Sequence, residues 1–291
     1  MRTKILFPLI LLSILAVFPG HSWLGDSLKS NIEENGLDSG VKIAFSEFES
    51  SFPLEFKASK ISFSPMKVPF PISAECQNPS GVMSLASALF LKRNIDIKAS
   101  CYSGQIQTSL SGPLLSNQNN FDFAVSSLNF GEHSLTKLFG VSGMLSASGE
   151  GSSDEGGERI EELTGEVSLS DVNYPGGFSY RGLFTVPEIA NFNASCEVQI
   201  EGSEHDLKNC KGDSSLGSFK GRANAAISKS GLLVSGTSNF EIELKAPGMK
   251  TIAPYLALAS GKYSENPASR WKFSSEKLAN GREWSKITPL N

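Results

Sequence analysis

The chain has 291 residues, of which 40% are hydrophobic and 19% are charged, and this composition excludes an intrinsically disordered protein. The formal net charge is −4, from 26 basic and 30 acidic residues, and no dense run of Lys or Arg occurs. Because phosphate-backbone binding needs a clustered basic surface, we do not expect a nucleic-acid-binding protein. Many glycines (27) and phenylalanines (19) favour strands and turns over helices.

The first residues carry an export signal. Arg2 and Lys4 precede an uncharged apolar run at residues 5–18. A positive end followed by such a run inserts in the inner membrane with its Lys/Arg side in the cytoplasm. We therefore expect everything after Trp23 to be exported, which places the bulk of the chain in the bacterial periplasm.

Two interpretations of residues 1–24 stay open, a membrane anchor and a cleaved signal segment. Gly20 and Ser22 are small enough for positions −3 and −1 of a cleavage point before Trp23. The apolar run is shorter than the ~20 residues that span a bilayer, although extending it through Leu24 reaches that length. A cleaved signal would make the protein soluble in the periplasm, and an anchor would attach it to the inner membrane.

Residues 25–40 read as a short helix and linker, with Asp26 as the helix cap, Leu28 and Ile32 on one face and Gly36 at the end. From residue 41 the apolar period changes to two, which is typical of half-buried antiparallel strands. The alternating segments are Val41–Phe45, Phe52–Phe56, Ile61–Phe63, Ile95–Cys101, Ile106–Leu110, Phe121–Val125, Leu163–Leu169, Phe219–Ile227 and Phe240–Leu244.

We therefore predict a mainly β fold, with residues 41–291 forming a single periplasmic β-rich domain. Its core is a long curved antiparallel sheet, arranged as a meander, as a groove or as a partly closed, barrel-like structure. Glycines within the strands allow such a sheet to bend.

A few short helices are expected beside the sheet. Good helix formers predict one over residues 81–94 and a turn over 134–140. A third, within 248–261, has Pro254 in its first turn and three apolar side chains, Ile252, Leu256 and Leu258, facing inward. The polar tail, 262–291, forms either a last hairpin or a segment along the surface.

Four cysteines agree with export, because an even number in an exported chain favours disulfides. They are Cys76, Cys101, Cys196 and Cys210, and three pairings are allowed. Pairing each cysteine with its neighbour in sequence closes the shortest loops, and each such pair brackets two expected strands. Zinc is disfavoured because the sequence has no C-x-x-C motif and its three histidines are scattered.

The acidic stretch at residues 150–162 is a candidate metal- or phosphate-binding loop. Its carboxylates are Glu150, Asp154, Glu155, Glu158, Glu161 and Glu162. They do not follow the order of a calcium-binding loop, and a phosphate-binding loop needs a lysine. We interpret the stretch as two strands and a solvated turn. His133 and His205 have carboxylate neighbours but no G-x-S-x-G nucleophile motif. We expect no catalytic residues, cofactor or metal, and no enzymatic activity.

The layout resembles the type II secretion system protein N (GspN) family and, more broadly, AsmA-like and TamB-like periplasmic proteins. The opening order is a membrane segment, DSLKSNIEEN, VKIAF and SFPLEFKASKISFS. The middle, LTKLFGVSGMLSASGEG and LTGEVSLSDVNY, and the end, TIAPYLALASGKY with GREWSKITPLN, are also similar to that family. The resemblance covers most of the chain, and chain length suits GspN better than the longer AsmA relatives. The four cysteines match no family pattern.

The resemblance implies a non-enzymatic component of a type II protein secretion system, held at the inner membrane by its N-terminal segment. Its partners would be other secretion-system proteins in the inner membrane and periplasm. The alternative, implied by the AsmA-like layout, is a lipid-binding or lipid-transport protein that holds acyl chains in an apolar β-groove. Phe-rich strands with few charges on the inward face suit that role. An ordinary packed core and a periplasmic hydrolase with a polar pocket are further alternatives.

Overall fold

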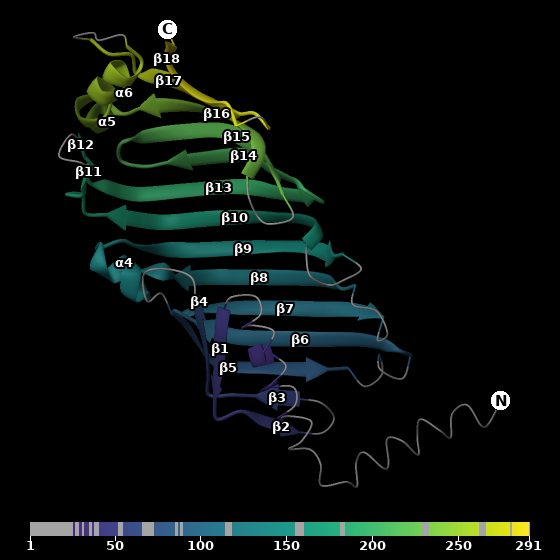
Figure 1. Cartoon of the computed structure of the whole chain (residues 1–291). Coiled ribbons are helices and arrows are strands. Elements are labelled where there is room, and N and C mark those ends of the chain that lie inside the picture. Colours follow the sequence, from purple (N-terminus) through teal and green to yellow (C-terminus); the bar gives the residue numbers. More distant parts are fainter. Residues whose placement is uncertain are drawn as a thin grey trace, which may run out of the picture. The chain divides into compact units, whose positions relative to one another are not determined.

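The computed structural model is mainly β, with a few short helices (Figure 1). It describes residues 26, 29–30, 32–34, 37, 41–51, 55–65, 73–84, 87, 90–113, 118–154, 160–180, 184–228, 233–261, 266–279 and 281–290. Sixteen strands belong to an antiparallel sheet whose order largely follows the chain; β1 and β18 end that order, and the sheet does not close. The predicted antiparallel meander is confirmed.

The chain divides into two compact units, and the boundary falls within strand β8 (Asn120–Asn129). The first unit runs to Val125, and the second comprises Ser126–Asp154 and the described residues from Ile160 onward. The expected membrane segment, residues 1–24, lies outside the described residues. Within the described ranges, no helix is long and apolar enough to cross a membrane.

The first unit begins with the predicted helical segment, since its described residues from Asp26 to Leu37 are helical. Its predicted boundaries are wrong, because Asp26, expected as the cap, and Leu37, beyond the expected end at Gly36, are both helical. The strands of the first unit follow the order β1-β4-β5-β6-β7-β8, with β2 and β3 paired beside β5. They are β1 (Val41–Ser46), β2 (Glu49–Ser51), β3 (Glu55–Lys57), β4 (Lys60–Pro65), β5 (Ala74–Met83), β6 (Lys92–Cys101) and β7 (Gly104–Pro113).

A small aromatic cluster packs at one edge of the first unit. The Phe45 and Phe48 rings lie 5.3 Å apart edge to face, and Phe48 stacks on Phe56 at 5.9 Å. The Phe56 ring fills the space above Gly81 of β5, where any Cβ would lie 2.0 Å from a ring carbon. Aromatic burial of this kind holds the short β2–β3 hairpin on the sheet.

Both ends of the helix predicted over residues 81–94 are wrong, because they belong to strands. Gly81 and Met83 end strand β5, and Lys92 already belongs to β6, where Ile95 pairs with Met83. Of the residues between them that the structure describes, only Ser87 is helical. Cross-strand pairing therefore overrides the local helix propensity of this segment.

In the second unit the strands follow the order β8-β9-β10-β13-β14-β15-β16-β17-β18. They are β9 (Ser142–Ser153), β10 (Ile160–Tyr174), β13 (Ile189–Glu201), β14 (Glu204–Asp213), β15 (Gly217–Ile227), β16 (Leu233–Leu244), β17 (Arg270–Lys277) and β18 (Glu283–Leu290), with a separate hairpin of β11 (Ser179–Tyr180) and β12 (Phe184–Thr185). The β17–β18 hairpin confirms the first of the two forms expected for the tail.

The helices of the second unit gather at one end of its strands, on the left in Figure 1. They are η1 (Phe130–Glu132), α4 (Ser134–Leu138), α5 (Ala246–Thr251) and α6 (Ala253–Ala259). Both predictions of helix in these regions are confirmed, and Pro254 lies in the first turn of α6 as expected.

The main buried cluster of the second unit lies beneath α5 and α6. Leu244, Ala253, Ala257 and Trp271 form it, and Ile252 and Leu256 pack against it as predicted. The prediction that Leu258 faces inward is wrong, because Leu258 is 69% exposed. The buried face of α6 carries alanines instead, because only small side chains let the helix backbone approach the Trp271 ring closely.

Candidate functional site: the apolar face of the second unit

Each cysteine is joined to its neighbour in sequence. Cys76 and Cys101 form one disulfide between directly paired residues of β5 and β6. Cys196 and Cys210 form the other, between β13 and β14, at a bulge that Asn209 opens with a φ of 50°. The structure thus selects one of the three pairings that the sequence allowed. Two disulfides indicate an oxidising, extracytoplasmic compartment.

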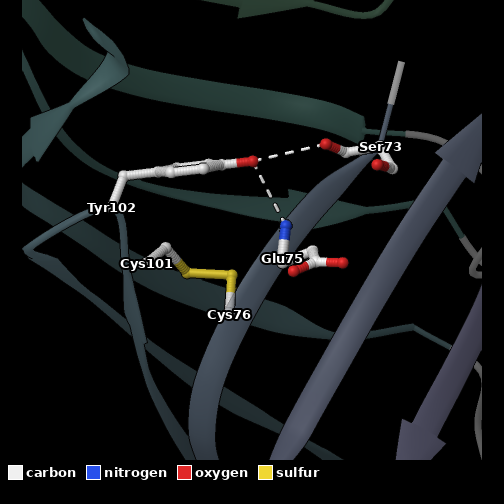
Figure 2. The surroundings of a disulfide bond; sticks show 5 residues. All are labelled: Ser73, Glu75, Cys76, Cys101 and Tyr102. Carbon is white, nitrogen blue, oxygen red and sulfur yellow. Dashed lines mark hydrogen bonds between the residues drawn. A yellow bond between two sulfur atoms is a disulfide. The ribbon is translucent and has the colours of Figure 1, made fainter. Parts of the chain in front are cut away.

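A tyrosine reinforces the first disulfide (Figure 2). The Tyr102 hydroxyl accepts a hydrogen bond from the Glu75 amide at 3.2 Å and donates one to the Ser73 carbonyl at 3.4 Å. Tyr102 and Ser103 form the two-residue turn between β6 and β7, and both have positive φ. This arrangement fixes the start of β5 beside the β6–β7 hairpin and is structural in character.

The polar residues that the sequence singled out lie on different elements in the described part of the chain. Strands β9 and β10 flank the acidic stretch as predicted, and its middle, residues 155–159, lies outside the described residues. His133 caps helix α4, where its Nδ1 accepts from the Leu135 amide, and His205 sits on strand β14. Across the described part of the chain, no group of three His, Cys, Asp or Glu residues could hold a metal.

Among the described residues, Lys57 has a raised pKa. The Glu55 carboxylate accepts a hydrogen bond from Lys57 and attracts its charge, which raises the pKa of that ammonium group. The Nζ to Oε1 distance is 2.7 Å, and the pair lies on the exposed surface of β3. An ion pair in that setting contributes little to stability and marks no site.

The strand register of the second unit separates apolar from charged side chains onto opposite faces. Because successive residues of a strand point to opposite faces, directly paired residues share a face. One continuous row crosses eight strands: Ala147, Val167, Cys196, Cys210, Gly221, Phe240, Phe273 and Ile287. We call the face that carries this row the apolar face.

The neighbouring row toward the strand ends without helices carries mostly small side chains. It consists of Gly149, Gly165, Val198, Leu207, Ala223, Ser238, Ser275 and Ser285. We call it the small-residue row. Larger groups flank it, including Phe240 and Val167 on one side and Leu163 and Ile200 on the other. Seven strand spacings of ~4.8 Å make the row about 34 Å long.

Almost every charge on paired positions lies on the other face, which we call the charged face. Glu166, Glu197, Lys211, Lys220 and Glu241 are examples. The exceptions on the apolar face are His205 and the pair Lys277–Glu283, all near the strand ends without helices. This segregation arises because each strand alternates apolar and polar residues, and the pairing of the eight strands places the apolar positions on the same face.

The described residues cover the apolar face at one end of its strands only. Helices α5 and α6 cover Leu244 and Trp271, and the Phe130 ring covers Gly143 at the start of β9. Beyond them, the apolar side chains of β10, β13 and β15 remain partly accessible to solvent, and Leu207 is 39% exposed. Exposed apolar patches are a common feature of interaction sites, so this face is the candidate site of the second unit.

Chemically, this face offers contact to apolar groups and little else. Two of its serines, Ser238 and Ser275, hydrogen-bond to each other at 2.7 Å, so these hydroxyl groups are partnered within the sheet. The alternation in the sequence predicts few charges on this face, but it does not predict the small-residue row. That row appears only when the register aligns residues from eight separate strands.

We compared the chain with protein families, curated proteins and solved structures. No protein-family model, no curated protein and no solved structure matches the chain.

Proposed function

We propose that this protein is a non-enzymatic, exported protein that binds lipid acyl chains along the apolar face of its second unit. The observation that supports this proposal most strongly is that the face spans eight strands and that almost all charges at paired positions lie on the opposite side. The described residues cover only the end beneath α5 and α6. We further propose that the sheet curves, so that its apolar face forms a groove for the acyl chain.

An acyl chain suits this surface better than a folded partner does. The small-residue row is long and narrow, and its lining has few free hydrogen-bonding groups to recognise a polypeptide backbone. Burying one CH₂ group contributes about 0.8 kcal/mol, so eight buried groups contribute roughly 6 kcal/mol before ordering costs. That value corresponds to a dissociation constant in the range of roughly tens of micromolar.

The test is to titrate the purified full-length chain with a fluorescent fatty acid and to identify co-purifying lipid by mass spectrometry. Val198→Glu places a charge in the middle of the small-residue row and is expected to weaken binding about tenfold or more, because the acyl chain would have to desolvate a carboxylate. Thr164→Glu is the matched control, since Thr164 is exposed on the charged face, beside Val198 on the neighbouring strand.

A second variant separates a loss of lipid binding from misfolding caused by the new charge. Val198→Trp fills the small-residue row without adding charge and is expected to reduce the amount of bound lipid. Wild-type protein that carries no lipid and binds no fatty acid would contradict the proposal, as would equal binding by wild type and both Val198 variants.

The second candidate is the one that the GspN resemblance implies, a component of a type II protein secretion system at the bacterial inner membrane. Its partners would be other secretion-system proteins, and the N-terminal segment would attach it to the membrane or be cleaved. The edge strand β18 favours a protein partner, since it pairs only with β17 among the described strands and leaves backbone groups for an added strand.

A deletion strain distinguishes the two functions. Exoproteins retained in the periplasm with a normal outer-membrane barrier would support the secretion role and contradict lipid transport as the main role. Normal secretion with a permeable outer membrane would support the lipid role.

A further inference from the structure

A hollow lies on the charged face of the second unit, over strands β14 to β17. Its volume is about 1060 Å³. The cationic side chains that line it are Lys208, Lys211, Lys220, Arg222 and Lys272, and the acidic ones are Asp206 and Glu241. The hollow is therefore locally positive in a chain whose formal net charge is −4.

The cations at its centre are poorly compensated. Lys211 lies directly opposite Lys220, and Arg222 follows two residues later on the same face. Like charges placed opposite each other destabilise a strand pair. Lys220 reaches Glu241 at 3.2 Å, but the same carboxylate also lies 4.0 Å from Arg270.

Three of the cations make no ion pair with any residue in the described ranges. They are Lys211, Arg222 and Lys272, and all three are exposed. The five cations of the hollow outnumber its two acidic residues, so a bound anion would reduce the repulsion among them. Departures of this kind from local stability are expected at functional sites.

Two asparagines add neutral donors to the same hollow. The Asn224 Oδ1 accepts from the backbone and the hydroxyl of Thr237, each at 2.9 Å, and the Asn239 Oδ1 accepts from the Ser274 hydroxyl at 3.1 Å. Because both oxygens accept hydrogen bonds within the sheet, the Nδ2 groups are the donors that these amides offer to a ligand.

We infer that this hollow binds a phosphate-bearing anion, held between Lys211, Lys220 and Arg222. A phosphate group has several acceptor oxygens and up to two charges, so it can contact all three cations, and the Arg222 guanidinium matches its geometry in a bidentate manner. The phosphate belongs either to a soluble anion or to a lipid headgroup. This inference does not depend on acyl-chain binding, because the hollow and the apolar face are on opposite sides of one layer.

The experiment measures thermal unfolding of the purified full-length chain in a neutral detergent by tryptophan fluorescence. Inorganic pyrophosphate is the probe in one arm, and micelles containing phosphatidic acid, compared with phosphatidylcholine, are the probe in the other. The variant is Lys211→Gln/Arg222→Gln. The control, Lys42→Gln/Lys250→Gln, removes the same charge from exposed positions outside the hollow.

We expect at least one probe to raise the unfolding temperature of wild type and of the control, with an apparent affinity roughly tenfold higher than for the double variant. Added salt should weaken the effect. Stabilisation by pyrophosphate identifies a soluble anion as the ligand class, and stabilisation by phosphatidic acid alone identifies a headgroup. The inference is overturned if neither probe stabilises wild type, or if the double variant responds as wild type does.

Discussion

Single side chains shape this sheet where its strands depart from regular pairing. The Asn173 Oδ1 accepts from the amide of Asn191, and the Asn193 Oδ1 accepts from the amide of Asp171, each at 3.0 Å. Asp171 and Asn191 both have positive φ, at the points where the β10–β13 register shifts. The two asparagine side chains replace the backbone bonds that the bulges interrupt, which is why short amide side chains are favoured there.

Gly81 shows the same dependence on one side chain, through packing rather than hydrogen bonding. Gly81→Ala places a Cβ where the Phe56 ring now lies, so the β2–β3 hairpin must shift. We expect this substitution to reduce the free energy of unfolding of the first unit by about 1–3 kcal/mol, the usual cost of overpacking. Urea denaturation followed by far-UV circular dichroism measures the change.

The double variant Gly81→Ala/Phe56→Leu provides the control. A smaller, flexible leucine leaves room for the new methyl group, so the two changes should not be additive. Strict additivity would show that contact with Phe56 is not the cause.

Strands were predicted well from segments with clear alternation of apolar and polar residues, and helices less well from short apolar segments. Nine alternating segments predicted strands, and each coincides with one in its described residues. The helix expected over residues 81–94 does not include its two ends, because Met83 and Ile95 pair across β5 and β6, a long-range contact that local propensity does not include.

Helix α6 was predicted to exist, but its orientation was partly wrong. Ala257 is 1% exposed beside Trp271, whereas Leu258 is exposed. We therefore expect Ala257→Leu to reduce the free energy of unfolding of the second unit by about 1–3 kcal/mol, because the added volume displaces the helix from Trp271. Leu258→Ser should change it by less than about 0.5 kcal/mol.

Fluorescence of Trp271 during denaturation distinguishes these two variants, because the ring is buried under α6. A larger loss of stability for Leu258→Ser than for Ala257→Leu would mean that the helix packs through the face first expected from the sequence.

At the scale of the whole molecule, each unit has its own disulfide and its own small packed cluster. Cys76–Cys101 and the Phe45–Phe48–Phe56 cluster belong to the first unit, and Cys196–Cys210 and the Trp271 cluster belong to the second. In a single layer each strand contacts mainly its neighbours, so perturbations are expected to remain local, as in repeat proteins.

We predict that Cys76→Ala/Cys101→Ala destabilises the first unit by about 3 kcal/mol, because the unfolded chain loses a cross-link. The second unit, followed by the fluorescence of Trp271, should unfold at the same midpoint as in the wild type, within experimental error. Trp23→Phe/Trp284→Phe provides a background in which Trp271 is the remaining tryptophan. Equal shifts by circular dichroism and by fluorescence would show instead that the two units unfold as one cooperative structure.

The sequence by itself determined the mainly β class, the antiparallel meander and most strand positions, because alternation with period two is a local property of the chain. It also indicated an exported protein, through the N-terminal apolar run and the even number of cysteines. Only the tertiary structure decided the disulfide pairing, the small-residue row and the basic hollow. No Lys/Arg run predicts that hollow, since Lys211, Lys220 and Arg222 become neighbours only when β14 pairs with β15. Registers between strands are long-range contacts, and these sites consist of residues that the registers bring together.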